Sequence, residues 1–354
     1  FSDLSAENYW PGWLGPKRDG WVKGFDPPKK WPAKLKQIWR LKVGTGYGTP
    51  VVVGGRVYQH ARQGEEEVVC SVDLKTGKKI WRSGHNTPFK MGGGGEKHGK
   101  GPKSNPTYAD GRLFVMSITG TLSSWDVKDG KLLWRKNYNS RFKPSYPKWG
   151  MCNSPVVDGN RVIAHFGNVE KGVLVALDVK TGKEIWHFKT ELAIEAAPLV
   201  VGEVVYIGST DGFLYALRTK DGKLLWKYQT DAEIIGAANH ADRPKSKDKV
   251  IIVGSYDNFV HCVDAKKGKG LWKFETSNYI NGVPTILDGN KVVFGGCDAV
   301  LYVVGLEDGK LLRSVEVEAP IAASVAVADG IGYVGHFDNA VMAFDLETGD
   351  VVWT

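Results

Sequence analysis

Long apolar runs are absent from this sequence. No stretch approaches the roughly 18 apolar residues that a membrane-spanning helix requires, so we expect no transmembrane helix. The first ten residues, FSDLSAENYW, lack the basic start and apolar centre of a signal peptide, and the first residue is not methionine. A mature protein that has lost its signal peptide would begin in this way, and so would a trimmed chain. Export is the interpretation that we favour.

Cysteine is also scarce. The four cysteines are Cys70, Cys152, Cys262 and Cys297, with no CxxC pair and no two of them adjacent. Each falls in a different part of the repeat pattern described next, on an expected strand or at its end. We therefore expect buried thiols that behave as small apolar side chains, and a disulfide is the alternative, because sequence alone does not set connectivity.

One hairpin recurs along the chain. The stretch ALDVKTGKEIW, which ends at Trp186, has close variants that end at Trp81, Trp134, Trp226, Trp272 and Trp353. A further copy has Arg313 in place of the tryptophan, and LKQIW, which ends at Trp39, resembles the last strand of a copy without its front half. The turn glycines at 77, 130, 182, 222, 268, 309 and 349 lie 53, 52, 40, 46, 41 and 40 residues apart. The period is therefore near 40, with insertions.

A period of about 40 to 45 residues with short strands is typical of a β-propeller blade. Each period contains four short apolar segments separated by Gly, Asn or Asp, which predicts four antiparallel strands. The pairs Asp211-Gly212, Asp257-Asn258 and Asp338-Asn339 should form the tight turns between second and third strands, because these residues tolerate positive φ. The cassette tryptophan should bury its ring between neighbouring blades.

We therefore predict an all-β fold: a β-propeller of four-stranded antiparallel blades, with seven blades in this chain and eight if the natural chain continues. The expected domain organisation is an N-terminal extension rich in Pro and Trp at residues 1–38, followed by a single propeller at residues 39–354. Propellers avoid an exposed sheet edge by closing the ring, and the LKQIW strand at Trp39 is the expected clasp.

The net charge of +8 favours an anionic partner such as lipid or polysaccharide. Many of the lysines fall in the repeated turns, where they are expected as solvated surface residues. No recognised nucleic-acid-binding module accompanies the charge, so we do not expect nucleic-acid binding.

Two long insertions, at residues 86–104 and 137–153, connect one expected blade to the next and should lie on the same rim. Their cations alternate with aromatic residues, which suits contacts with phosphate, sulfate or sugars, although solvated shielding loops would look the same. Residues just ahead of each innermost strand should face the channel mouth. On these grounds the predicted binding residues are His98, Lys103, Arg141, Tyr146, Trp149, Asn153, Glu195 and Asn281.

Neither a metal site nor a catalytic motif is expected. His60, His165 and His336 each end the second strand of a different blade, so they should lie too far apart to share one zinc ion. Glu195 is the one acid among the expected channel residues. Carboxylate and carboxamide oxygens suit calcium, but Glu195 alone is expected as a hydrated channel residue.

The cassette ALDxxTGKxxW, with PVVxGxRVY patterns in TPVVVGGRVYQH and SPVVDGNRVIAHF, resembles the pyrroloquinoline quinone (PQQ) repeat. The resemblance covers residues 9–354. It implies the fold of quinoprotein alcohol dehydrogenases and of the propeller lipoprotein of the β-barrel assembly machinery, and it is weakly specific for function.

Family members that use the quinone hold it with calcium, an aspartate base and a disulfide between adjacent cysteines. This sequence has no adjacent cysteines and no CxxCH haem motif. Glu195, Asn281 and Asp298 are the right types for the family's calcium ligands, but Asp298 falls in a predicted hairpin turn. Losing the groups that position a cofactor should lose the reaction.

We therefore favour a noncatalytic scaffold, exported to the periplasm or elsewhere in the bacterial cell envelope, that binds a protein or an anionic envelope component without a cofactor. One alternative is a dehydrogenase of alcohols or sugars that depends on PQQ and calcium and uses Glu195 and Asn281. Another is a carbohydrate-binding propeller that uses the loop from Arg141 to Trp149.

Overall fold

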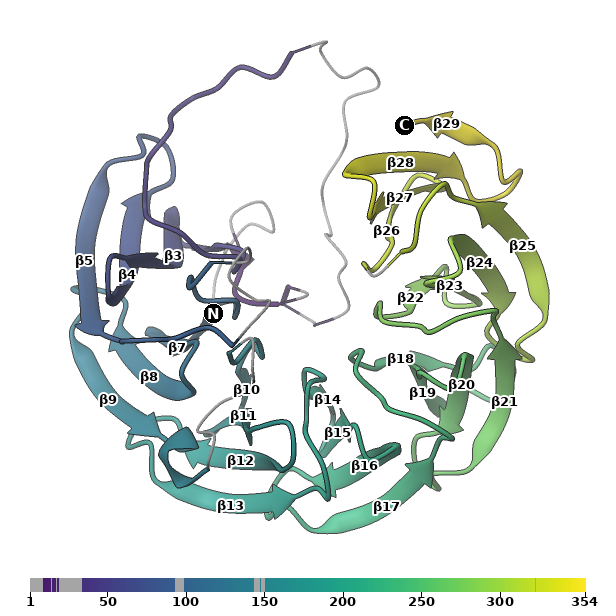
Figure 1. Ribbon diagram of the computed structural model, residues 1–354, viewed down its shortest axis with the longest axis horizontal. Helices are drawn as coiled ribbons and strands as arrows, with labels where there is room; N and C mark the ends of the chain where they lie inside the picture. Colours follow the sequence, from purple (N-terminus) through teal and green to yellow (C-terminus); the bar gives the residue numbers. More distant parts are fainter. Residues whose placement is uncertain are drawn as a thin grey trace. The chain divides into compact units, whose positions relative to one another are not determined.

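The computed structural model of the chain (Figure 1) describes residues 9–13, 15–16, 18, 34–92, 99–142, 147, 150–321 and 323–354. It contains two compact units, Phe1–His187 and Phe188–Thr354, and each is considered by itself. Over the described residues, both units consist of short antiparallel strands, and the one helical element is the 3-10 turn η3 (Asn139–Arg141).

The chain forms seven sheets in which the strands pair in chain order. The first three sheets are β1 (Tyr9–Trp10), β2 (Val51–Val53), β3 (Arg56–Gln63), β4 (Glu66–Asp73) and β5 (Lys79–Asn86); β6 (Thr107–Ala109), β7 (Arg112–Met116), β8 (Thr121–Asp126) and β9 (Leu132–Asn137); and β10 (Val156–Asp158), β11 (Arg161–Gly167), β12 (Gly172–Asp178) and β13 (Glu184–Lys189). The next two are β14 (Leu199–Val201), β15 (Val204–Gly208), β16 (Phe213–Arg218) and β17 (Leu224–Gln229); and β18 (Asn239–Asp242), β19 (Lys249–Gly254), β20 (Phe259–Asp264) and β21 (Gly270–Glu275). The last two are β22 (Thr285–Leu287), β23 (Lys291–Gly295), β24 (Val300–Gly305) and β25 (Leu311–Glu316); and β26 (Ala326–Ala328), β27 (Ile331–His336), β28 (Ala340–Asp345) and β29 (Val351–Trp353).

The predicted fold class is confirmed: the seven sheets are the four-stranded antiparallel blades of a β-propeller. The first blade carries one strand more, because β1 pairs with the inner edge of β2 and sets Tyr9 opposite Val53. First strands of neighbouring blades contact one another within each unit, as β6 does with β2 and β10 in the first unit.

The repeated Asp-x-x-x-Gly turn is held by its own side chains. Asp178 Oδ1 accepts hydrogen bonds from the backbone N–H of Thr181 at 2.8 Å and from its hydroxyl at 2.7 Å. Gly182 follows with φ +65°, a left-handed conformation that glycine adopts without steric cost. These hydrogen bonds join residues that are close in the sequence, and for that reason the hairpin can be predicted from the sequence.

The cassette tryptophan joins one blade to the next, as predicted. Trp134 Nε1 donates to Val179 O in the third blade at 3.0 Å, and the indole ring lies against Gly182. A Cβ built on Gly182 would stand 2.7 Å from that ring, so the turn glycine also makes room for the tryptophan. Arg313 takes the same role without an indole, because its guanidinium donates to Glu347 O in the next blade.

The expected strand over LKQIW is not formed, and that prediction is wrong: residues 35–39 carry no strand. Trp39 still docks as a cassette tryptophan does, because its Nε1 donates to Leu74 O at 2.8 Å and its ring lies against Gly77. The tryptophan contact therefore forms here without a hydrogen-bonded backbone ladder.

The aspartates between second and third strands serve the turn, as expected. Asp211 accepts hydrogen bonds from Phe213 N at 3.0 Å, from the Tyr215 hydroxyl at 2.9 Å and from Glu191 N at 3.1 Å. The last of these bonds ties the connection from the previous blade to the hairpin. Asn258 and Asn339 have φ of +72° and +61°, as a tight turn at these positions demands.

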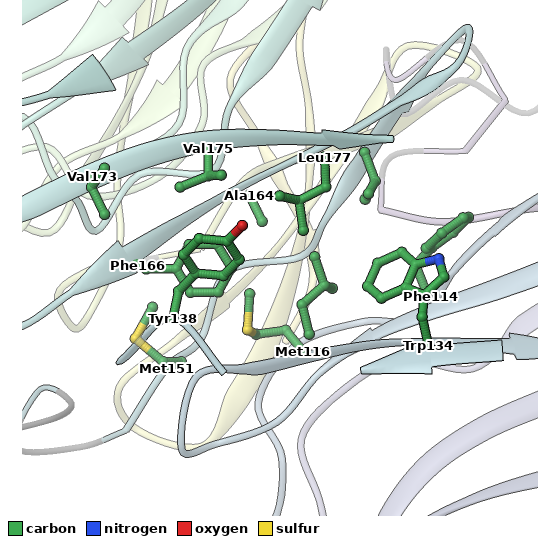
Figure 2. Close-up of a cluster of buried hydrophobic side chains, with 12 residues drawn as sticks. Phe114, Met116, Trp134, Tyr138, Met151, Ala164, Phe166, Val173, Val175 and Leu177 are labelled. Carbon is green, nitrogen blue, oxygen red and sulfur yellow. The ribbon is translucent and has the colours of Figure 1, made fainter. Parts of the chain in front are cut away.

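The core lies between blades. Figure 2 shows the cluster between the second and third blades, where Trp134 and Tyr138 lie over side chains of β11 and β12. The Tyr138 and Phe166 ring centroids are 4.9 Å apart. Tyr138 is thus anchored in the core although Ser140 and Arg141, shortly after it, are exposed.

Candidate functional site

A pocket of about 300 Å³ opens where the end of β9 meets the turn before β13, in the first unit. Its lining is polar and largely charged: Lys136, Asn137, Tyr138, Arg141, Gly182, Lys183 and Glu184. The pocket contains Arg141, one of the predicted binding residues, and we call it the Arg141 pocket.

The turn η3 fixes the position of Arg141. Asn137 accepts a hydrogen bond from Ser140 N at 3.1 Å, and buried Asn139 accepts one from Gly167 N in the third blade at 2.9 Å. The Arg141 guanidinium then lies over the Tyr138 ring, 4.7 Å from its centroid, in a cation–π contact. The guanidinium is therefore held over an aromatic face that the core itself anchors.

Glu184 is the one acid in the pocket. Its Oε1 lies 2.6 Å from His187 Nδ1, and its Oε2 lies 3.8 Å from Arg141, which is longer than a hydrogen bond. Burial raises the pKa of the Tyr138 hydroxyl to about 12, and the Glu184 carboxylate, to which it is hydrogen-bonded, adds to the rise. Tyr138 is therefore a neutral donor.

Lys103 lies outside this pocket, in the connection that leads into the second blade. Its side chain is half-buried, and that burial lowers the pKa of its ammonium while nearby Cys152 opposes the change. The two residues come from consecutive blade connections of the first unit. Cys152 is exposed and Cys297 is partly exposed, in contrast to the expectation of buried thiols, and none of the four cysteines forms a disulfide.

Asn153 does not face solvent. It is 2% exposed, and its amide donates to His165 O at 3.1 Å inside the third blade. The exposed residue is its neighbour Cys152, three positions before Pro155. The sequence holds a signal for this position, because a proline precedes the first strand of several blades. Lys103 and Glu195 lie three residues before Pro106 and Pro198, just as Cys152 lies three residues before Pro155.

The connections leave little room for a side chain at the position that Asn153 occupies, two residues before the proline. A Cβ on Gly48 would stand 2.3 Å from Ser104 O in the next connection, and one on Gly282 would stand 2.6 Å from Ala323 O. Small or inward-pointing residues are therefore required there, and the surface-facing position is one residue earlier.

Glu195 and Asn281 lie in the second unit, at the end of the sheets that carries the connections between blades and the hairpins between second and third strands. We call this the connection end. The Glu195 carboxylate is exposed but flanked by protein; this partial burial raises its pKa, and neighbouring Glu233 raises it further. Neither acid has an ion-pair partner among the described residues.

Asn281 is engaged with its neighbours. Its Nδ2 contacts Cys297 Sγ at 3.2 Å, and its side chain is hydrogen-bonded to the Tyr256 hydroxyl. The Tyr256 ring stacks on Tyr279 with centroids 4.5 Å apart and planes at 7°. This stacked pair links the fifth and sixth blades at the connection end.

Of the three side chains of the right type for the family's calcium ion, Asp298 is engaged elsewhere. Asp298 accepts hydrogen bonds from the Tyr302 hydroxyl at 2.7 Å, from Ser277 N at 3.0 Å and from Val300 N at 3.2 Å. Its two oxygens are therefore taken up by the hairpin, as the sequence predicted. Over the described ranges, no three His, Cys, Asp or Glu side chains gather in a group that could hold a metal ion.

Three predicted binding residues, His98, Tyr146 and Trp149, lie outside the described residues. His60, His165 and His336 are buried, each within its own blade. None of the described residues belongs to a helix with the length and apolar character needed to span a membrane.

The connection end of the second unit also exposes large apolar side chains. Leu192 and Tyr279, in connections between blades, are 43% and 47% exposed, and Phe337, in the β27–β28 hairpin, is 66% exposed. These residues were not predicted from the sequence, because an isolated apolar residue in a loop belongs to no periodic pattern.

Seven antiparallel blades with the aspartate–glycine turn and its interblade tryptophan define a PQQ-like repeat β-propeller. The model of the family described as outer membrane protein assembly factor BamB matches residues 65–260 and 256–354. These matches cover well over half of the sequence, and the chain belongs to that family.

Curated relatives fall into two groups. Quinohemoprotein alcohol dehydrogenase ADH-IIG of Pseudomonas putida is 35% identical over 163 residues, which are 44% of this chain and 22% of that enzyme. Outer membrane protein assembly factor BamB of Burkholderia pseudomallei is 25% identical over 186 residues, which are 50% of this chain and 41% of the relative. The matched part of this chain thus spans less than half the length of either protein.

Solved structures establish the fold. BamB from Moraxella catarrhalis superposes with a TM-score of 0.61 at 17% identity, over 85% of this chain and 83% of that one. A europium-containing methanol dehydrogenase gives a TM-score of 0.64 at 16% identity, over 88% and 78%. Assembly factors and dehydrogenases share this architecture, so fold alone does not select between the two functions.

Proposed function

We propose that the protein is a noncatalytic, exported propeller that docks a protein partner, with residues 39–354 as the propeller and residues 1–38 as an extension. The observation that carries the proposal is the exposure of Leu192, Tyr279 and Phe337 at the connection end of the second unit. Large apolar side chains exposed at the same end of a set of blades can serve as anchors for a docking partner.

The backbone beneath this surface is firmly held. Thr210 N donates to Ala193 O at 2.9 Å and Phe337 N donates to Pro320 O at 3.2 Å, so hairpins and connections are tied together. A surface that is rigid before binding loses little conformational entropy when a partner docks. The unpaired carboxylates of Glu195 and Glu233 would favour a partner that carries basic residues around an apolar anchor.

The family supports the same class of function. Its description and two of the similar proteins name an outer membrane protein assembly factor, which is a role in assembly. Export to the periplasm or the wider cell envelope is part of this proposal.

A photo-crosslinking amino acid at Phe337 tests the proposal in the source cell. We expect one discrete crosslinked protein, and we expect Tyr279→Ser in the same chain to weaken it. The matched control places the crosslinker at Leu312, which is 50% exposed on the outer strand β25. Equal labelling from both positions would show that the connection end is not a docking surface.

The competing function is a quinone-dependent dehydrogenase, favoured by the 35% identity to the Pseudomonas putida enzyme. Against it stands Asp298, whose oxygens are already occupied. A dye-linked assay with added PQQ, calcium and short alcohols separates the two functions. Dye reduction that depends on PQQ and is lost in Glu195→Gln would defeat the scaffold proposal.

A further inference from the structure

We propose that the Arg141 pocket binds a phosphate group, either as free phosphate or as the phosphomonoester of a small phosphorylated molecule. The pocket lies in the first unit, so this inference is independent of partner docking at the connection end of the second unit.

Charge is the first argument. Lys136, Arg141 and Lys183 contribute three positive charges and Glu184 one negative charge, which leaves +2 in a pocket of about 300 Å³. A phosphomonoester carries about −2 near neutral pH and would balance it. Among the described residues, neither lysine ammonium has an ion-pair partner, and the single ion pair of Arg141 is the 3.8 Å contact with Glu184.

Preorganisation is the second argument. The Arg141 guanidinium lies over the Tyr138 ring, and that ring packs on buried Phe166. The guanidinium nitrogens of Arg141 make no hydrogen bond to any described residue, so their planar set of donors is available to an oxyanion. Phosphate suits a guanidinium particularly well, because two N–H groups can donate in parallel to two oxygens.

The pocket is not a by-product of the repeat. Lys136 stands where Tyr228 and Phe274 fill the corresponding joints of the fourth and fifth blades. Glu184 stands where Leu132 occupies the second blade. Charged residues therefore line this joint at positions where the compared blades carry aromatic or aliphatic side chains.

Isothermal titration calorimetry on the whole chain at low ionic strength tests the proposal. The probes are inorganic phosphate, glucose 6-phosphate and acetate. We expect saturable one-to-one binding of a phosphate probe, with acetate about tenfold weaker or worse because it carries half the charge. Tighter binding of glucose 6-phosphate would identify an attached phosphate as the source, and equal or tighter binding of inorganic phosphate would identify the free ion.

Variants of the pocket should change the affinity for phosphate in both directions. Arg141→Gln and Lys183→Gln should each weaken phosphate binding about tenfold. Glu184→Gln should strengthen it, which a merely damaged fold would not do. Lys131→Gln is the matched control, because Lys131 occupies the position of Lys183 in the second blade but lies outside the pocket.

Far-ultraviolet circular dichroism of each variant confirms that the blades remain folded. Absence of saturable phosphate binding by the parent chain would overturn the proposal. So would binding that survives Arg141→Gln unchanged, or that Lys131→Gln weakens as much as Lys183→Gln does.

Discussion

Glu67 Oε2 lies 3.1 Å from His60 Nε2, and the exposed fractions of the two side chains are 0% and 1%. The other carboxylate oxygen accepts a hydrogen bond from Ile118 N of the second blade at 3.1 Å and lies 3.7 Å from Arg62. Burial is the largest influence on the pKa of Glu67 and raises it, but His60, Ile118 N–H and Arg62 together outweigh burial, so the net pKa is lowered. An ionised carboxylate thus joins the first blade to the second.

Glu67→Gln should lower the free energy of unfolding by about 3 kcal/mol, because it removes the only buried counter-charge among the described ion-pair partners of the Arg62 guanidinium and leaves the exposed Glu65 carboxylate, at 3.6 Å, as the other. Urea denaturation followed by tryptophan fluorescence measures the loss. Glu66→Gln is the matched control: Glu66 pairs with Arg82 at 2.6 Å on the surface, and its loss should cost less than about 1 kcal/mol. Equal costs for the two variants would show that the buried network does not stabilise the joint.

His165 should make stability depend on pH. Burial lowers its pKa from 6.5 to about 3, and neither ring nitrogen has a hydrogen-bond partner among the described residues. Above pH 6.5 both folded and unfolded chains hold it neutral. Between pH 6.5 and about pH 3 the unfolded chain binds a proton at this histidine and the folded chain does not, so the free energy of unfolding falls by about 1.4 kcal/mol per pH unit as pH decreases.

His165→Leu removes that contribution. Relative to the parent, the variant should be about 2 kcal/mol more stable at pH 5 than it is at pH 8, whatever the packing change costs at both values. Urea titrations of the two proteins at the two pH values give the comparison. An identical stability difference at pH 5 and pH 8 would contradict the prediction.

Gly182→Ala should destabilise the joint between the second and third blades for two reasons. The backbone has φ +65°, and the added Cβ would stand 2.7 Å from the Trp134 ring. We expect a total cost of about 3 kcal/mol, from backbone strain and displacement of the indole. Gly159→Ala separates the two effects, because Gly159 has φ +56° and nothing within 4 Å of its Cβ position. That control should cost about 1 kcal/mol, and a cost equal to that of Gly182→Ala would exclude a role for the ring contact.

The carbohydrate-binding alternative makes its own prediction. If the loop from Arg141 to Trp149 stacks on sugar rings, the protein should bind selected glycans on an array, and Trp149→Ala should abolish that binding. Trp353→Ala is the control, because Trp353 is 49% exposed but lies on the outer strand β29. Unchanged binding by Trp149→Ala would remove the hypothesis.

The sequence alone was sufficient to predict the turns and hairpins within each repeat. The Asp178–Thr181 turn, the left-handed glycine after it and the Asp211 hairpin are set by chemistry within a few residues, so their spacing revealed the strands and the period. The docking of the cassette tryptophan was also predictable, since in a regular repeat every copy meets the same neighbour, as Trp134 meets Gly182.

Tertiary structure alone decided which side chains meet. Arg141 and Lys183 share a pocket because consecutive blades lie face to face, and nothing in their separation along the chain indicates it. The same holds for the contact between Glu67 and Ile118. Asn153 is buried whereas its neighbour Cys152 is exposed. The close approach of neighbouring connections decides which of the two residues faces solvent, and no local sequence pattern encodes that approach.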